Sequence, residues 1–180
     1  MEITKKLAEV EIADTFKVGD IEWIKFDEKD GSVIAVAKDI LFRSEFGFNN
    51  NYLDKNCTIR ERLEKEILPK IELAIGAENL IEFETDLVSL DGDKQYGKYN
   101  SKISLPTFDF YRENVEIFDK HTPEEWWWLS TPFSTNKHWN NCWVSCVSPY
   151  GDVYFRNYCY YDGVRPFIIF VSSISVTCEE

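Results

Sequence analysis

The pattern of hydrophobic and polar residues predicts a β-hairpin within residues 16–42. Hydrophobic positions are frequent from Ile21 to Phe26, the segment "DEKDG" supplies a turn, and "SVIAVA" follows as a run rich in β-branched residues. Alternation and β-branched residues both favour strands, and a Gly-containing turn between two such runs is typical of a hairpin. Residues 1–15 fit either a short strand or a short helix.

Residues 57–76 show the clearest helical pattern in the chain. Thr58 followed by Glu61 matches a capping box, in which each side chain hydrogen-bonds the backbone N–H of the other residue. Pro69 lacks a backbone donor and clashes with the preceding turn, so we expect a break or kink there, and Gly76 fits the end of the helix. A hydrophobic stripe, which predicts one buried face, recurs every four residues at Ile59, Leu63, Ile67, Ile71 and Ile75.

A strand, a loop and a second helix are expected between residues 78 and 119. The loop "DLVSLDGDKQYG" lacks the spacing of a calcium-binding loop and fits a solvated surface loop. Thr107 caps the second helix, and "HTPEE" predicts a further helix start with Thr122 as its cap. From residue 126 onward the pattern is one of strands and turns. The apolar stripe of the second helix consists of Phe108, Tyr111, Val115 and Phe118.

Length and composition indicate one globular domain. The 180 residues can form one core, 44% of them are hydrophobic, and the aromatic share of 16% is high. The net charge of −12 opposes direct binding to nucleic acids or anionic membranes, which requires clustered Lys and Arg. It is compatible with a basic protein partner, although the ordinary solubility of an acidic cytosolic protein is the simpler explanation.

The candidate chemistry of the cysteines and histidines does not add up to a catalytic or metal site. His138, Cys142 and Cys146 are spaced four residues apart, but on a strand such side chains lie about 13 Å apart, too far to share one zinc ion. No pattern places His121 or His138 beside a thiol. We therefore expect no metal, no cofactor and no enzymatic activity. The odd number of cysteines, five, and the absence of an apolar signal segment favour a cytoplasmic protein of a bacterium or a phage-infected host.

Residues 153–160 carry an aromatic pattern that predicts a binding surface. On a strand, successive side chains point to opposite faces, so this segment divides into two sets. One set is mostly apolar and suits a core, whereas the other contains three tyrosines and an arginine, which supply rigid contact area at interfaces. Tyrosines whose hydroxyls reach water are also common on half-buried sheets. The core set is Val153, Phe155, Asn157 and Cys159, and the binding set is Tyr154, Arg156, Tyr158 and Tyr160.

Two tryptophans in the preceding segment "NKHWNNCWVSCV", Trp139 and Trp143, either extend this aromatic patch or fill the core. Asn140 and Asn141 either cap a turn or donate to a ligand amide. The predicted binding residues are therefore Tyr154, Arg156, Tyr158, Tyr160, Trp139 and Trp143.

Three segments of the C-terminal third resemble a bacterial and phage domain family of unknown function. The segment "WWWLSTP" (126–132) is similar to the Trp-Trp-Leu-Arg-Ser-Pro signature of that family, and "VSPYGDVYF" (147–155) to its Gly-centred strand turn. The segment "DGVRPFIIF" (162–170) is similar to its Gly-Val-Arg-Pro-Ala ending. The hairpin and the two helix starts also follow in the family's order.

The resemblance implies a C-type-lectin-like fold, related to that of formylglycine-generating enzyme and of retroelement-diversified phage receptor-binding proteins. It implies a single α+β domain with two main helices and a bent, mainly antiparallel sheet. Residues 17–172 would form its core, between an N-terminal extension (1–16) and a tail (173–180). In relatives, the segments that correspond to "NKHWNNCWVSCV" and "GDVYFRNYCYY" face the ligand. Ser130 replaces the signature arginine, whereas the matching positions are Leu129, Pro132, Gly163, Arg165 and Pro166.

These observations predict a non-catalytic module that binds a protein or other ligand through its C-terminal aromatic face. The alternative is a phage-encoded or mobile-element-encoded acidic inhibitor of a host nucleic-acid-binding defence protein, similar to an anti-CRISPR protein. A third possibility, implied by the resemblance, is an enzyme of the formylglycine-generating branch. The acidic inhibitor would use a surface cluster drawn from Glu61, Glu64, Glu66, Glu72, Glu82, Glu84 and Asp86.

Overall fold

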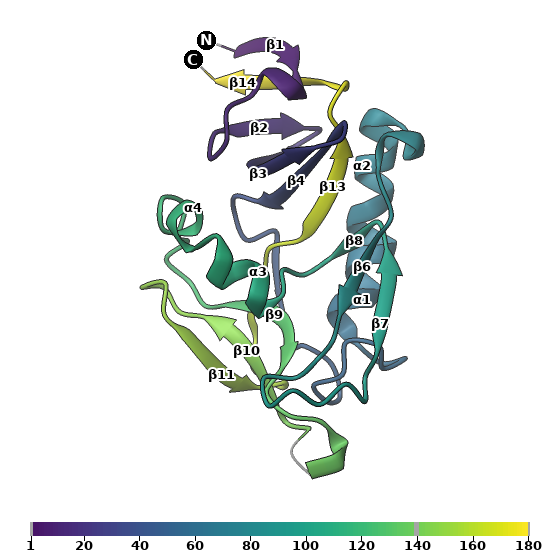
Figure 1. Ribbon diagram of the computed structural model, residues 1–180, viewed down its shortest axis with the longest axis vertical. Helices are drawn as coiled ribbons and strands as arrows, with labels where there is room; N and C mark the ends of the chain where they lie inside the picture. Colours follow the sequence, from purple (N-terminus) through teal and green to yellow (C-terminus); the bar gives the residue numbers. More distant parts are fainter. Residues whose placement is uncertain (1, 139–140, 180) are drawn as a thin grey trace.

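The computed structural model describes residues 2–138 and 141–179, which form a mixed α+β structure built mostly of sheet (Figure 1). This confirms the predicted α+β class. Seven strands form the larger sheet in the order β1-β14-β2-β3-β4-β13-β8, and five form a second sheet in the order β11-β10-β9-β12-β5. The described strand pairs are antiparallel except for the contact between β9 and β12, which is parallel.

Both sheets draw their strands from widely separated parts of the chain. The larger sheet contains β1 (Glu2–Lys6), β2 (Thr15–Val18), β3 (Ile21–Lys29), β4 (Ser32–Ala37), β8 (Ile103–Ser104), β13 (Phe167–Val171) and β14 (Ser175–Glu179). The second sheet contains β5 (Phe42–Ser44), β9 (Trp127–Pro132), β10 (Trp143–Val147), β11 (Val153–Asn157) and β12 (Asp162–Val164), while β6 (Phe83–Asp86) pairs with β7 (Lys98–Ser101). The helical elements are η1 (Leu7–Glu9), α1 (Thr58–Arg62), η2 (Leu63–Ile67), α2 (Leu68–Ile75), η3 (Ala77–Asn79), α3 (Phe108–Glu113), α4 (Val115–Asp119) and η4 (Asn136–His138).

The two ends of the chain lie side by side in the larger sheet (Figure 1). Strand β1 pairs with β14 from Glu2 opposite Glu179 to Lys6 opposite Ser175, and β14 also pairs with β2. The segments 1–16 and 173–180, which the resemblance sets outside the family-like core, therefore contribute strands to the same sheet as that core.

The predicted hairpin is confirmed as β3 and β4, and its first strand contains a buried lysine. The Lys25 side chain is 2% exposed, and its ammonium group donates to the carbonyls of Leu7 and Val10 at 3.2 and 2.8 Å. The carboxylate of Glu28 lies 2.5 Å from the same nitrogen. A buried ammonium is tolerated only when its donors are satisfied, so Lys25 ties the segment after β1 to the hairpin.

The first helical segment lies where it is predicted, but it contains a π-helical turn. Helices α1 and α2 are joined without interruption by η2, which is the π-helical part. A step of four residues overshoots one α-helical turn by about 40°, so a four-residue repeat drifts around an α-helix. The wider π turn reduces that drift and keeps the hydrophobic stripe on one side. The buried members of this stripe are Ile59, Leu63, Ile67 and Ile71.

The capping box predicted for Thr58 and Glu61 is wrong. Thr58 is the first helical residue, the preceding cysteine occupies the cap position, and the Glu61 carboxylate pairs instead with Lys65 at 2.7 Å. Pro69 lies in the first turn of α2 directly after the π turn, so the helix continues past it. Gly76 ends the helix as predicted, with a φ of +87° that favours glycine.

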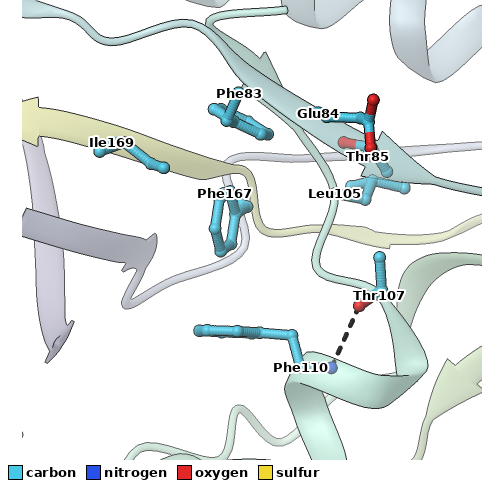
Figure 2. Close-up of a pocket in the computed structure, with 8 residues that line it drawn as sticks. All are labelled: Phe83, Glu84, Thr85, Leu105, Thr107, Phe110, Phe167 and Ile169. Atoms are coloured by element: carbon cyan, nitrogen blue, oxygen red, sulfur yellow. Dashed lines mark hydrogen bonds between the residues drawn. The ribbon is translucent and has the colours of Figure 1, made fainter. Parts of the chain in front are cut away.

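The second helical segment begins at its predicted cap. The Thr107 hydroxyl accepts a hydrogen bond from the backbone N–H of Phe110 at 3.1 Å (Figure 2), and α3 is followed by the short helix α4. The further helix start predicted at Thr122 is wrong. The Thr122 hydroxyl donates to the carbonyl of Phe118 at 3.1 Å, at the end of α4, and the chain then enters strand β9.

The core contains two hydrophobic clusters on opposite faces of strands β3, β4 and β9. The larger cluster includes Trp23 and Trp128 together with the stripe of helices α1 and α2. The smaller cluster includes Trp127 together with Tyr111 of α3 and Phe118 of α4. The neighbouring residues Trp127 and Trp128 thus enter different clusters, as expected for a strand that is buried on both faces.

Gly163 in β12 lies in close contact with Ile40. A Cβ atom at this glycine would lie 2.4 Å from the Cδ1 atom of Ile40. The Gly163 N–H also donates to the carbonyl of Trp126 at 2.7 Å, which holds β12 beside β9. A larger residue would therefore have to displace either Ile40 or the strand.

We expect Gly163→Ala to lower the free energy of unfolding by about 1–3 kcal/mol, because the added methyl group overpacks a filled site. In an Ile40→Ala background the same substitution should cost less than half as much, since the colliding side chain is gone. Chemical denaturation of the four proteins measures both effects. Equal losses in the two backgrounds would show that Ile40 is not the obstacle.

Candidate binding site

Four of the predicted binding residues surround one shallow depression. Trp143, Tyr154, Arg156 and Tyr160 line it together with Trp126 and Phe155, and its volume is about 310 Å³. The predicted residue Tyr158 is half-buried, packs against the larger core cluster and does not line the depression. Trp139 lies outside the described residues.

The depression is formed around strand β11 and the turn that follows it. The strand ends at Asn157, so the strand predicted to extend to residue 160 is too long. The backbone N–H of Tyr160 donates to the carbonyl of Asn157 at 3.0 Å, and this turn brings the Tyr160 ring back over the strand. Trp126 reaches the same place from the residue preceding β9.

The division of this segment into a core face and a binding face holds only in part. Tyr154 and Tyr160 are half-exposed as expected, and Val153 packs against the smaller core cluster. Phe155, expected in the core, is 39% exposed and contacts Phe133 at a ring-centre distance of 4.7 Å. The physical reason is that β11 is the outermost strand of its sheet, so fewer elements are available to cover its side chains.

The Arg156 guanidinium is the centre of the site. Its Cζ atom lies 4.8 Å from the ring centre of Trp126 and 4.2 Å from that of Tyr160, and its Nη1 donates to Oδ1 of Asp162 at 2.8 Å. The Tyr154 ring meets Trp126 edge-on at 5.2 Å. Two aromatic contacts and one ion pair therefore fix the position of a normally mobile side chain.

The partner carboxylate of Arg156 is almost fully buried. The Asp162 side chain is 2% exposed, and burial raises its pKa, while the positive charges of Arg156 and Arg43 oppose that rise. Its second oxygen, Oδ2, has no hydrogen-bond partner among residues 2–138 and 141–179. Asp162 thus depends strongly on Arg156 to remain charged inside the protein.

This arrangement suits a planar or apolar group better than an anion. The positive charge of Arg156 is already balanced by Asp162, and the exposed surfaces around it are the rings of Trp126, Trp143, Tyr154 and Tyr160. Aromatic rings with polar edges give large contact areas at a small entropic penalty. The depression therefore presents aromatic rings around a guanidinium whose charge is already balanced.

A buried polar network supports the segment that carries Trp143. Asn50 is fully buried, donates to the carbonyls of Ser134 and Trp143 at 2.8 and 2.9 Å, and accepts from the Tyr96 hydroxyl at 2.8 Å. Ser134 in turn donates to Asp91 at 2.8 Å. Residues 86–97, predicted to form a solvated surface loop, are therefore partly buried. Their Asp91 and Tyr96 side chains hydrogen-bond to Ser134 and Asn50, close to the segment that carries Trp143.

Sequence reasoning missed Trp126 and Phe155. Trp126 stands in the "WWWLSTP" segment, whose resemblance points to the fold, and its contact with Arg156 joins residues 30 positions apart. For Phe155, the alternation of a strand predicts which residues share a face but not whether that face is covered.

No protein-family model matches the chain. The search of curated proteins and the search of solved structures also give no match.

Two of the cysteines are buried as neutral thiols, and one histidine contacts a backbone carbonyl. Burial raises the pKa of Cys57 to about 11 and that of Cys146 to about 12, which keeps both as neutral thiols. The His121 ring lies 2.9 Å from the carbonyl of Ala13.

Within the described ranges, no group of three or more His, Cys, Asp or Glu residues is arranged to hold a metal ion. No helix of the described chain is long and apolar enough to cross a membrane.

The acidic cluster considered for an inhibitor is largely paired within the protein. Five of its seven carboxylates form ion pairs with lysine or arginine, and several of these pairs are i,i+4 contacts on the first helical segment. Each pair reduces the field that the cluster presents to a basic partner. The paired members are Glu61, Glu64, Glu66, Glu72 and Glu84.

The pair of Arg156 and Asp162 predicts a specific dependence of stability on pH. Since the folded-state pKa of Asp162 is raised, the folded protein binds this proton more tightly than the unfolded chain. The contribution of Asp162 to the free energy of unfolding therefore falls as the pH rises from the unfolded-state pKa of about 4 to the higher folded-state pKa, and is constant above it. Asp162→Asn should remove this fall, and Arg156→Gln should enlarge it and cost about 2–3 kcal/mol near neutral pH.

Denaturant unfolding of wild type and both variants between about pH 3 and pH 7 measures these effects. The difference between wild type and Asp162→Asn isolates the contribution of this carboxyl group from those of other acidic residues. A difference that does not change with pH would contradict the assignment.

Proposed function

We propose that this protein is a non-catalytic binding domain that recognises a partner protein through the depression around Arg156. The observation that carries the proposal is the fixed Arg156 guanidinium between Trp126 and Tyr160, surrounded by half-exposed aromatic rings. Arginine, tyrosine and tryptophan are the residue types that dominate the binding energy of protein interfaces. Their immobilisation before binding reduces the entropy lost on association.

The exposure of these rings supports the same proposal. Trp143, Tyr154 and Tyr160 are 41%, 50% and 48% exposed, and all three line the same depression. Single exposed hydrophobic residues are ordinary on protein surfaces, whereas a contiguous group indicates an interaction site. A partner that covers the group would remove apolar surface from water, which favours association.

The proposed fold is that of a C-type-lectin-like domain, on the basis of the resemblance described above. The residues on which the resemblance rests are buried and concentrate where β9 meets β12 and where the chain passes to β13. Their burial agrees with a role in the fold rather than in binding. These residues are Leu129, Pro132, Gly163, Arg165 and Pro166.

The aromatic depression is favoured over the acidic cluster as the binding surface. Most carboxylates of that cluster are already paired, and surface ion pairs weaken the long-range attraction that an acidic inhibitor would need. The net charge of −12 nevertheless favours a basic partner for the protein as a whole. The proposed cytoplasmic location rests on the sequence.

A double variant, Tyr154→Ala with Tyr160→Ala, tests the proposed surface. Immobilised wild-type protein should capture a partner from a bacterial host lysate, and the double variant should retain less than about a tenth of it, because two central aromatic contacts are lost. Tyr150→Ala is the matched control, since Tyr150 is 90% exposed and does not line the depression. Quantitative mass spectrometry of the captured proteins, with circular dichroism as a check of folding, gives the comparison.

Equal capture by wild type and the double variant would eliminate this surface. A partner that is lost from the Tyr150→Ala control as well would place the interface elsewhere on the hairpin. A partner that is released by moderate salt from all variants alike would favour the acidic inhibitor instead.

A further inference from the structure

The outer edge of strand β11 has no neighbouring strand. β11 ends the order β11-β10-β9-β12-β5, and Figure 1 shows it at the margin of the second sheet. Within residues 2–138 and 141–179, the only strand that pairs with it is β10. An edge of this kind presents backbone donors and acceptors that can pair with another chain.

The hydrogen bonds of the hairpin show which backbone groups face outward. Ser148 N–H donates to the Asp152 carbonyl at 2.8 Å, and Tyr158 N–H donates to the Cys142 carbonyl at 2.9 Å. In an antiparallel pair, hydrogen-bonded positions alternate with positions whose backbone groups point away. Tyr154 and Arg156 therefore bond to β10, while the N–H and C=O groups of Val153 and Phe155 and the N–H of Asn157 point to the open side. The Asn157 carbonyl is used by Tyr160.

The outward groups of Val153 and Phe155 have no hydrogen-bond partner in the described part of the chain. Exposed edge strands are usually protected by charged residues, especially lysine, by proline or by a bulge. β11 contains neither lysine nor proline, and its one charged residue, Arg156, is held by Asp162 and Trp126. The register between β10 and β11 is also continuous over its five pairs. This edge is therefore open and regular.

The edge is held in a strand conformation at both ends of the hairpin. The Tyr111 hydroxyl of α3 donates to the Gly151 carbonyl at 2.6 Å, at the turn between β10 and β11. At the other end, the Phe46 N–H donates to the Tyr158 carbonyl at 2.8 Å. A partner strand would thus meet a pre-formed edge and would not have to order it.

We propose that β11 accepts an extended segment of a partner protein as an additional strand, in which apolar or aromatic side chains alternate with basic ones. The inference rests on the proposed function and specifies its partner. Strand addition is a general mode of peptide recognition, in which the edge supplies backbone hydrogen bonds and flanking pockets select alternate side chains. The apolar side chains would all lie on one face of the added strand, where they would meet Tyr154 and the depression around Arg156. The basic side chains would lie on the other face, beside the rings of Phe155 and Phe133.

The basic character of the segment follows from charge. Arg156 is already paired with Asp162, the exposed residue Asp152 lies at the start of β11, and the exposed residue Glu124 lies two positions before Trp126. The protein as a whole carries a net charge of −12. A second copy of this chain would bring the same charge, and such repulsion disfavours pairing of two β11 edges.

A labelled synthetic peptide of about ten residues, in which lysine alternates with valine and phenylalanine, is a suitable probe. We expect wild-type protein to bind it, and the amide hydrogens of Val153 and Phe155 to exchange at least about tenfold more slowly in its presence. The same peptide with methyl groups on alternate backbone nitrogens should bind more weakly, and so should a version with glutamate in place of lysine. Fluorescence anisotropy and hydrogen exchange followed by NMR measure these effects without any change to the protein.

A pair of variants at one position separates the backbone from the side chain. Phe155→Ala removes only the ring, whereas Phe155→Pro also removes an N–H that points away from β10 and therefore is not used by the hairpin. We expect Phe155→Pro to bind the lysine peptide about fivefold more weakly than Phe155→Ala.

Absence of binding by the wild type, or unchanged exchange of the Val153 and Phe155 amides, would overturn the proposal. Equal binding of the glutamate peptide would overturn its basic character, and a dimer that Phe155→Pro dissolves would make a second copy the occupant. The proposed function fails separately, through Tyr154→Ala with Tyr160→Ala. If that double variant loses its partner while Phe155→Pro keeps it, the aromatic surface stands and the strand addition does not.

Discussion

The buried guanidinium of Arg165 connects the parts of this structure. Arg165 lies between β12 and β13, where the chain passes from one sheet to the other, and its Nε donates to the Ala37 carbonyl at the end of β4, 2.9 Å away. Its Cζ atom lies 4.7 Å from the ring centre of Trp127 and 5.6 Å from that of Phe118. Burial lowers its pKa to about 10, and its two terminal nitrogens have no hydrogen-bond partner among the described residues. Contact with aromatic faces therefore replaces part of the hydration that the cation loses.

The same short segment connects this junction to the depression. Moving back along the chain from Arg165, Gly163 donates to the carbonyl of Trp126, and Asp162 accepts from Arg156. Trp126 is the ring on which the Arg156 guanidinium packs. Gly163 and Asp162, which position Trp126 and Arg156, thus lie within three residues of the buried Arg165. The packing of Arg165 in the core therefore helps to fix the positions of the residues that line the depression. A shift of β12 would separate Trp126 from Asp162 and release Arg156.

The sequence could predict those elements whose formation depends on residues close together in the chain. The hairpin of β3 and β4, the buried stripe of the first helix, the stop at Gly76 and the Thr107 cap all depend on residues close together in the chain. The helix predicted at Thr122 failed because its hydroxyl closes the preceding helix and the following tryptophans are drawn into two core clusters. Likewise, the alternation within β11 could predict the two sets of side chains, but whether Phe155 is covered depends on the order of strands in the sheet, which no local pattern specifies.

The packing of the core does not account for the aromatic residues on β11 and in the turn after it. The two core clusters are complete without Tyr154, Phe155 and Tyr160, each of which leaves more than a third of its surface in water. Polar residues with strand propensity, such as threonine, would satisfy the same backbone and leave less apolar surface exposed. Arg156 differs from these residues, because it also balances the buried charge of Asp162 and so belongs to both the fold and the surface. The ion pair with Asp162 and the contacts with Trp126 and Tyr160 fix the Arg156 guanidinium within the protein itself, so the proposed binding surface is formed before any partner is present.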